Sequence, residues 1–321
     1  MQKLFIGPMS LNTVNVVAKY PDKIGFIPSR RQIEYNGGYV NNWTTKQFTE
    51  YIKNINPLCV IERDHGGPAQ GSTMDNGLIS FQDDCNHMNI IHIDPWKKHQ
   101  NFKDGLDTTV DLINFCYKIN PNMLFEVGTE EAIRPTTPDE LDCMLSELKD
   151  RLSNVFNQIK YVVIQSGTSL EGTKNTGVYD EERLRKMIKV CKKYGKLSKE
   201  HNGDFIETDV LKNKMSCGLD AINIAPEFGQ LETKTILDNI SNQDTIDILF
   251  ELCLKSKKWV KWVNNDFDPH TNKLKLIIVC GHYLFCDKTF IAIKNQIPEI
   301  DKKINIVLTN RIESLLSIIY N

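Results

Sequence analysis

Short apolar runs recur along this chain, and each ends in polar residues or glycine. Such runs predict buried β-strands, because a strand that is covered on both faces has no polar side and loses the usual alternation. We expect strands at residues 4–7, 23–28, 58–62, 88–94, 123–127, 161–164, 196–201 and 221–226, of which 196–201 has the weakest pattern.

The stretches between these runs have helical spacing and helix start signals. Thr44 to Gln47 has the form of a capping box, and Thr137-Pro138 followed by two acids is typical of a helix start. Residues 105–119 and 180–194 carry apolar side chains at a helical period.

Strand and helix thus alternate eight times, which predicts an α/β fold, a (β/α)8 TIM barrel. The alternative is an open, doubly wound sheet, which concentrates polar strand ends at one switch point. Here they occur from one end of the chain to the other. We expect the barrel core in residues 1–230, and in 231–321 the last barrel helix with an appended C-terminal helical segment, the two forming one structural unit.

Composition narrows the class of protein. The chain has 321 residues, 40% hydrophobic and 25% charged, with a net charge of −2, which argues for a soluble globular protein and against a broad nucleic-acid surface. No apolar stretch approaches the roughly 20 residues that span a bilayer, and the apolar N-terminus is too short for a secretory signal. The nine cysteines form no CxxC pair. We therefore expect reduced thiols, a cytoplasmic protein, and neither nucleic acid nor membrane as a partner.

The third predicted strand delivers Asp64 and His65 directly before two glycines. A metal-dependent enzyme that makes or breaks a bond beside a carbonyl needs such a pair, one side chain as a metal ligand and the other as a base. We interpret Asp64 and His65 as functional residues at the end of this strand.

Other polar side chains follow the neighbouring strands, and in a barrel all strand ends meet at one mouth. These residues are His92, Asp94, Glu126, Glu130, Gln165, Glu200 and His201. Three histidines with carboxylates predict a site for zinc or a similar divalent ion, since three protein ligands and an open position are the catalytic pattern. Simpler interpretations stay open: His92 as a core histidine, Asp94 as a turn residue, Glu130 as a solvated loop acid, and Glu126 facing either the barrel interior or its mouth.

Basic residues near the strand ends suggest an anionic substrate. Arg30 and Arg31 follow the second strand, where they would bind a phosphate or carboxylate or would simply form a solvated loop. The solvated reading is favoured for Lys97 and Lys98. The remaining histidines lie in loops or in the tail, and we expect them outside the site: His87, His99, His270 and His282.

Taken in order, these motifs resemble one family. The segments are 31–39, 64–68, 91–94, 128–130, 165–167 and 200–201. Their order and spacing are similar to those of the class II tagatose-bisphosphate aldolase Z-type subunits, also called non-catalytic subunits. The resemblance runs from about Pro8 to the helical tail. It implies a barrel related to zinc-dependent class II aldolases, and some members resemble ketose-phosphate 4-epimerases that act on fructose 6-phosphate and tagatose 6-phosphate.

The resemblance also implies roles. Asp64 would be the general acid and base, with Glu130 and Asp94 as further catalytic carboxylates, and His65, His201 and Glu130 would hold the metal, most simply Zn2+. Asp94 and Gln165 would hold substrate hydroxyls. From the residues themselves, Arg30, Arg31 and His92 are further candidates for contact with substrate. The chain departs from the family in the loop after Glu130, and its Arg30-Arg31 pair is more basic than expected.

We therefore expect a metal-dependent epimerase that inverts C4 of a ketose phosphate by retro-aldol cleavage and re-formation of the C3–C4 bond. The alternatives are a class II sugar-phosphate aldolase, a stabilising subunit without activity, and a metal-dependent sugar isomerase. The expected small-molecule partner is a sugar phosphate, and the expected protein partner is a second copy of the chain or an aldolase subunit.

Overall fold

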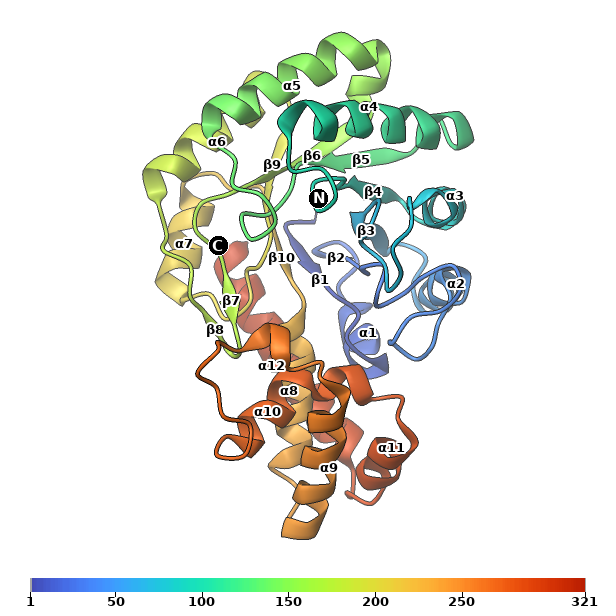
Figure 1. The fold of residues 1–321 in the computed structure, drawn as a ribbon, viewed down its shortest axis with the longest axis vertical. Helices are drawn as coiled ribbons and strands as arrows, with labels where there is room; N and C mark the ends of the chain where they lie inside the picture. The colour runs from blue at the N-terminus through green and yellow to red at the C-terminus, as the bar shows by residue number, and fades with distance from the viewer. Residues whose placement is uncertain (1, 321) are drawn as a thin grey trace.

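The computed structural model describes residues 2–320, and its centre is a closed barrel of eight parallel strands (Figure 1). The strands are β1 (Leu4–Ile6), β2 (Ile24–Phe26), β3 (Val60–Gly66), β4 (Ile90–Ile93), β5 (Leu124–Val127), β6 (Ile159–Ile164), β9 (Leu197–Glu200) and β10 (Ala221–Ile224). Because β1 pairs with both β2 and β10, the sheet has no edge. The (β/α)8 barrel is confirmed and the open sheet is excluded.

Helices follow the strands on the outside of the barrel (Figure 1). They are α1 (Leu11–Val17), α2 (Thr45–Ile55), α3 (Leu78–His87), α4 (Phe102–Ile119), α5 (Pro138–Leu152), α6 (Glu181–Lys193), α7 (Thr208–Ser216) and α8 (Pro226–Leu237). The capping box at Thr44 and the cap at Thr137 are formed as predicted. A short antiparallel hairpin, β7 (Leu170–Glu171) with β8 (Lys174–Asn175), lies between β6 and α6.

Alternate residues of each strand face the inside of the barrel. Phe5, Ile90, Tyr161 and Ala221 belong to one small apolar cluster there, whereas neighbours such as Ile91 and Phe125 pack outward under the helices. The same alternation turns Glu62, Glu126 and Lys199 inward, where all three are fully buried. The Lys199 ammonium lies 2.7 Å from Glu62 and 2.8 Å from Glu126. The barrel interior is therefore closed by an ion-pair cluster directly beneath the mouth.

The C-terminal segment forms a second body of helices beyond the barrel (Figure 1). It contains α9 (Gln243–Ser256), α10 (Lys273–Cys280), α11 (Lys288–Asn295) and α12 (Ile300–Ile319), with 3-10 turns at Val260–Trp262 and Gly281–Leu284. Helix α12 returns to pack against α1, α7 and α8, so the segment shares the core of the barrel's first and last helices. The predicted boundary after residue 230 falls inside α8.

Within residues 2–320, no single helix has the length and apolar character to cross a membrane. One bent pair, Lys273–Leu284 with Lys288–Asn295, meets that criterion by length and composition alone.

Candidate active site

A cavity of about 350 Å³ lies at the mouth of the barrel, between the strand ends and the C-terminal segment. Its inner end is lined by Asp64, His65, Glu130 and His201. Its outer end is lined by Arg31, Lys97, Lys261, Trp262 and His282. The cavity therefore combines residues from strands that are more than a hundred positions apart with residues of the helical tail.

A bulge in β3 brings both members of the Asp64-His65 pair to the mouth. Successive residues of a regular strand point to opposite faces, yet both side chains line the cavity. The β3–β4 register shifts between Arg63 and Gly66, and His65 has a φ of 46°. An unpaired residue in the left-handed region redirects its side chain, and such bulges occur beside active sites. The pair lies within β3 rather than in the turn after it.

Three histidines stand around one point beside Asp64. The ring centres of His65, His92 and His201 are 5.0–5.2 Å apart. One nitrogen from each ring and one Asp64 oxygen all lie within 4.8 Å of one another. This spacing is that of a group of side chains around a single ion.

Each ring is oriented by an acceptor behind it. His65 Nδ1–H donates to Asp94 at 2.6 Å, and His201 Nε2–H donates to Glu126 at 2.8 Å. A carboxylate that takes the outer proton of an imidazole leaves a lone pair on the other nitrogen, which is how proteins prepare histidine ligands for a metal. The free nitrogens, His65 Nε2 and His201 Nδ1, lie 3.9 and 3.7 Å from Asp64 Oδ1.

His92 is used differently. Its Nε2–H donates to the carbonyl of Gly128 at 2.9 Å, and its Nδ1 accepts the backbone N–H of His65 at 3.2 Å. Both nitrogens are therefore bonded within the protein, and the ring is fully buried. His92 supports the bulge that carries His65 and does not line the cavity, so its predicted contact with substrate is not retained.

The carboxylates and neutral imidazoles of this cluster favour a bound cation. Burial lowers the pKa of His92 to about 3 and that of His201 well below its usual range, so both rings are neutral. Although burial opposes it, the carboxylates of Asp64 and Glu130 raise the pKa of His65 well above its usual range. In the absence of a cation, these two carboxylates therefore favour the protonated form of His65.

Asp64 shows where an ion fits. Its Oδ1 is buried and has no hydrogen-bond partner among residues 2–320, and burial, with Glu126 and Glu130 contributing, raises the pKa of this carboxyl to about 7. Glu130 Oε2 lies 3.5 Å from His65 Nε2. Two imidazole nitrogens and two carboxylates around an unpaired oxygen are a donor set that suits zinc or a similar divalent ion.

Other predicted residues lie outside the cavity. Asp94 is fully buried and orients His65, with Gln70 donating to the same carboxylate oxygen at 3.0 Å. Gln165 donates to the carbonyls of Thr129 and Arg134 and accepts from Thr136 and Arg183. Asp94 thus acts through His65, and Gln165 has no free group for a sugar.

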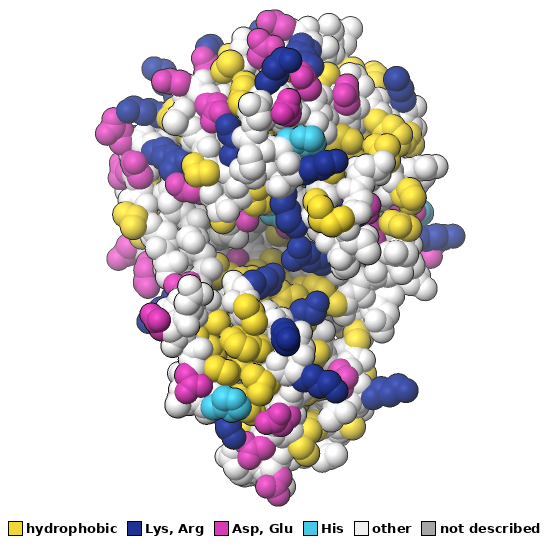
Figure 2. All heavy atoms as spheres, in the orientation of Figure 1, with side chains coloured by type: hydrophobic (Ala, Val, Ile, Leu, Met, Phe, Trp, Pro, Cys, Tyr) yellow, Lys and Arg dark blue, Asp and Glu magenta, His cyan; other side chains and the backbone are white. Residues whose placement is uncertain are grey.

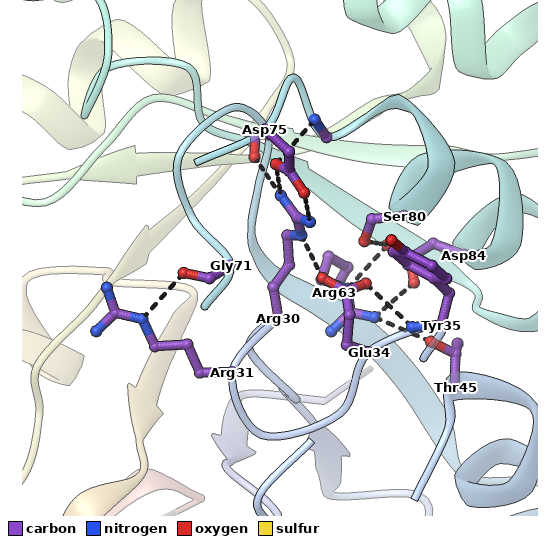
Figure 3. Close-up of polar contacts among 12 residues, drawn as sticks. Arg30, Arg31, Glu34, Tyr35, Thr45, Arg63, Gly71, Asp75, Ser80 and Asp84 are labelled. Atoms are coloured by element: carbon purple, nitrogen blue, oxygen red, sulfur yellow. Dashed lines mark hydrogen bonds and ion pairs between the residues drawn. The ribbon is translucent and has the colours of Figure 1, made fainter. Parts of the chain in front are cut away.

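Arg30 and Arg31 diverge, as Figure 3 shows. Arg30 is buried and bonds Glu34 and Asp75, each at 2.6 Å, as well as the carbonyl of Gly67. Its donors hold the loops together, so the prediction that it binds substrate is corrected. Arg31 points the other way, toward Gly71 (Figure 3), and lines the cavity.

Several site residues were not predicted. His282 was expected outside the site, but it is buried at the outer end of the cavity beside Lys261. Asn223 on β10 faces the cavity with both polar side-chain atoms unpartnered within residues 2–320. The spacing of the tail held no signal for His282. The polar Asn223 within the apolar run 221–226 was such a signal.

No protein-family model and no curated protein matches this sequence. Among solved structures, a probable tagatose 6-phosphate kinase from Sinorhizobium meliloti 1021 superposes with a TM-score of 0.75 at 12% identity, over 98% of this chain and 99% of the other. The fructuronate–tagaturonate epimerase of Cohnella laeviribosi gives 0.71 at 12% identity, over 99% and 81%. The YdjI aldolase of Escherichia coli K12 gives 0.58 at 12%, over 98% and 91%. At this identity the likeness shows the shared barrel, and the family resemblance drawn from the motifs stays a prediction.

Proposed function

We propose that this protein is a metal-dependent epimerase that acts on a ketose phosphate at C4. The observation that carries the proposal is the cluster of possible metal ligands beside Asp64: His65 Nε2, His201 Nδ1 and the Glu130 carboxylate. The fructuronate–tagaturonate epimerase and the YdjI aldolase have the same barrel, and this likeness supports a proposal of epimerase or aldolase chemistry.

His65, His201 and Glu130 would hold the ion, as the resemblance predicts. A divalent cation at this point supplies Lewis-acid polarisation of a ketose carbonyl. The orienting partners, Asp94 behind His65 and Glu126 behind His201, hold the outer ring protons. A bound cation would replace the second proton that the Asp64 and Glu130 carboxylates favour on His65.

Asp64 is the residue that moves the proton. Asp64 lines the inner end of the cavity next to His65 and His201, so its carboxylate can take the proton of the C4 hydroxyl. The C3–C4 bond then breaks, leaving a three-carbon enediolate and an aldehyde. If the aldehyde turns its other face and the bond re-forms, the new C4 alkoxide takes the proton back from Asp64 and the product is the C4 epimer.

The same cleavage yields an aldolase if the aldehyde leaves. Lys261, Trp262 and His282 of the C-terminal segment line the cavity, so they can contact the aldehyde fragment while it turns. These additional contacts favour the epimerase over the aldolase. The unpartnered Asp64 oxygen beside two histidines supports an enzyme over an inactive subunit, because a subunit without activity gains nothing from a buried acid oxygen without a hydrogen bond.

The test is to incubate the zinc-supplemented protein with fructose 6-phosphate and follow the carbon NMR spectrum. We expect a new ketose phosphate that differs only at C4, lost with a chelator or with Asp64→Asn. Accumulating three-carbon fragments would indicate an aldolase. A C1–C2 carbonyl shift with exchange of a carbon-bound proton would indicate an isomerase. An unchanged spectrum with all ketose phosphates would refute the enzyme and favour the partner subunit.

A further inference from the structure

Three cations line the outer end of the cavity, and the Glu130 carboxylate lines its inner end. Arg31 and Lys97 come from barrel loops, and Lys261 comes from the 3-10 turn after α9. None of the three forms an ion pair within residues 2–320. Arg31 and Lys97 donate only to the backbone carbonyls of Gly71 and Ala69, at 3.4 and 2.7 Å.

The charges of these cations act on one another's pKa values. Burial within the walls, followed by the charge of Arg31, lowers the pKa of Lys261 to about 8. The same two causes lower the pKa of Lys97. The three side chains are exposed, and like charges that line one cavity repel. A bound anion would turn that repulsion into attraction. Figure 2 shows Lys and Arg side chains gathered along the hollow between the barrel and the C-terminal segment.

Neutral polar groups without partners lie between the cations and the metal-binding end. His282 is 1% exposed, and neither of its ring nitrogens has a hydrogen-bond partner in the described chain. Asn223 is 4% exposed, and both its side-chain oxygen and nitrogen are also unpartnered. Buried polar groups are nearly always bonded in folded proteins. Two such side chains on one cavity wall indicate that a polar ligand completes them.

A second cavity of about 420 Å³ adjoins this end and shares Arg31, Tyr39, Lys261 and Tyr283 with the first. Lys257 and Lys258 line it as well. Its charge has the sign that attracts an anion toward the mouth.

We propose that the C-terminal segment recognises a polyhydroxylated ligand by one terminal anionic group, a phosphate ester or a carboxylate. Arg31, Lys97 and Lys261 hold the anion, and His282 and Asn223 bond hydroxyls along the carbon chain. This inference rests on the proposed function in that the same cavity receives the ketose. It adds where the anionic group of that substrate is held, by two barrel loops together with Lys261 of the appended segment.

The test is calorimetric titration of the full chain, with and without zinc, using fructose 6-phosphate, fructuronate, inorganic phosphate and neutral fructose. The variants are Lys261→Met, the charge-preserving Lys261→Arg, and Lys255→Met as a control. Lys255 is an exposed lysine on α9 that lines neither cavity. Loss of one charge-assisted contact should weaken binding about tenfold or more.

We expect fructose 6-phosphate or fructuronate to bind at least about tenfold more tightly than fructose. Lys261→Met should remove most of this difference, while Lys261→Arg and Lys255→Met keep it. Tighter binding of the phosphate ester would identify a phosphate ligand, and tighter binding of fructuronate would identify a carboxylate. Equal affinity for fructose and both sugar anions, or an unchanged affinity in Lys261→Met, would overturn the inference.

The two proposals fail separately. Anion binding that depends on Lys261, without turnover of any ketose, would support the anion site and refute the epimerase. Epimerisation with a KM that Lys261→Met leaves unchanged would refute the anion site and keep the epimerase.

Discussion

Glu126 links the barrel interior to the candidate metal centre, and replacing it tests that link. Its two oxygens have different partners: Oε1 accepts from His201 Nε2–H, and Oε2 accepts from the Lys199 ammonium, each bond being 2.8 Å. In Glu126→Gln, the amide oxygen turns to the ammonium, since the NH2 group cannot face a cation. The NH2 then faces His201, whose proton must move to Nδ1, the nitrogen that would bind the metal.

The expected size follows from these contacts. Loss of a carboxylate that orients a ligand histidine lowers metal affinity about 10- to 100-fold, which is about 1.4–2.7 kcal/mol. Removing one member of a buried ion pair lowers the free energy of unfolding by about 3–5 kcal/mol when the other member has no second partner. Glu126→Gln should cost less. Lys199 keeps Glu62 at 2.7 Å. We therefore expect a loss of about 1–2 kcal/mol in unfolding free energy, near that of one or two hydrogen bonds.

The matched control is Glu62→Gln. Burial and the charge of Glu126 raise the pKa of Glu62 well above its usual range, which favours the neutral acid while Glu126 is ionised, so an amide replaces it with little change in charge. In Glu126→Gln that neighbouring charge is gone, and Glu62 can pair with Lys199 as a carboxylate. It touches Lys199 and not His201. Zinc affinity, measured by competition with a chromogenic chelator, and urea unfolding should separate the two variants. Equal zinc affinity in Glu126→Gln and the wild type, or an equal fall in Glu62→Gln, would refute the reasoning.

Three further predictions concern other parts of the structure. Arg30→Met removes a buried cation from two carboxylates and should lower the unfolding free energy by about 3–5 kcal/mol without changing KM. A rise in KM without loss of stability would show instead that Arg30 binds substrate. Because the pKa of Lys261 is about 8, its ammonium is present below that pH and lost above it. The charged groups that act on Lys261 are Arg31, Lys97, Lys258 and Glu130. The KM for a ketose phosphate should therefore rise above about pH 8 in the wild type and only at higher pH in Lys261→Arg; identical pH profiles would contradict this. Zinc at about 100 times its Kd should stabilise the fold by about 2.7 kcal/mol, seen as a rise in Tm that a chelator reverses, and a Tm that does not respond to zinc would count against a specific site.

The apolar runs predicted all eight strands, because a barrel strand is buried on both faces and its sequence is therefore mostly apolar. The weakest of them, β9, carries Lys199 in its interior. Its partners, Glu62 and Glu126, are 137 and 73 positions away. No local pattern could show that this charge is paired within the core.

The candidate site was predicted less completely, because the sequence does not show which way a side chain points. Arg30 and Arg31 are adjacent, and spacing alone cannot tell which one turns into the loops and which into the cavity. Asp64 and His65 reach one mouth only because of the bulge in β3. Lys261 and His282 enter the site through two turns of the tail, whose placement depends on how α9 to α11 pack.

The account depends most on a metal ion beside Asp64. The most direct measurement is an anomalous difference map at the zinc absorption edge from crystals of the zinc-loaded protein. The account predicts one peak with His65 Nε2 and His201 Nδ1 at about 2.0–2.1 Å and a Glu130 oxygen at about 2.0–2.2 Å, with Asp94 and Glu126 still behind the two rings. A zinc-loaded crystal without a peak in this cluster, or with its only peak elsewhere on the chain, would contradict it.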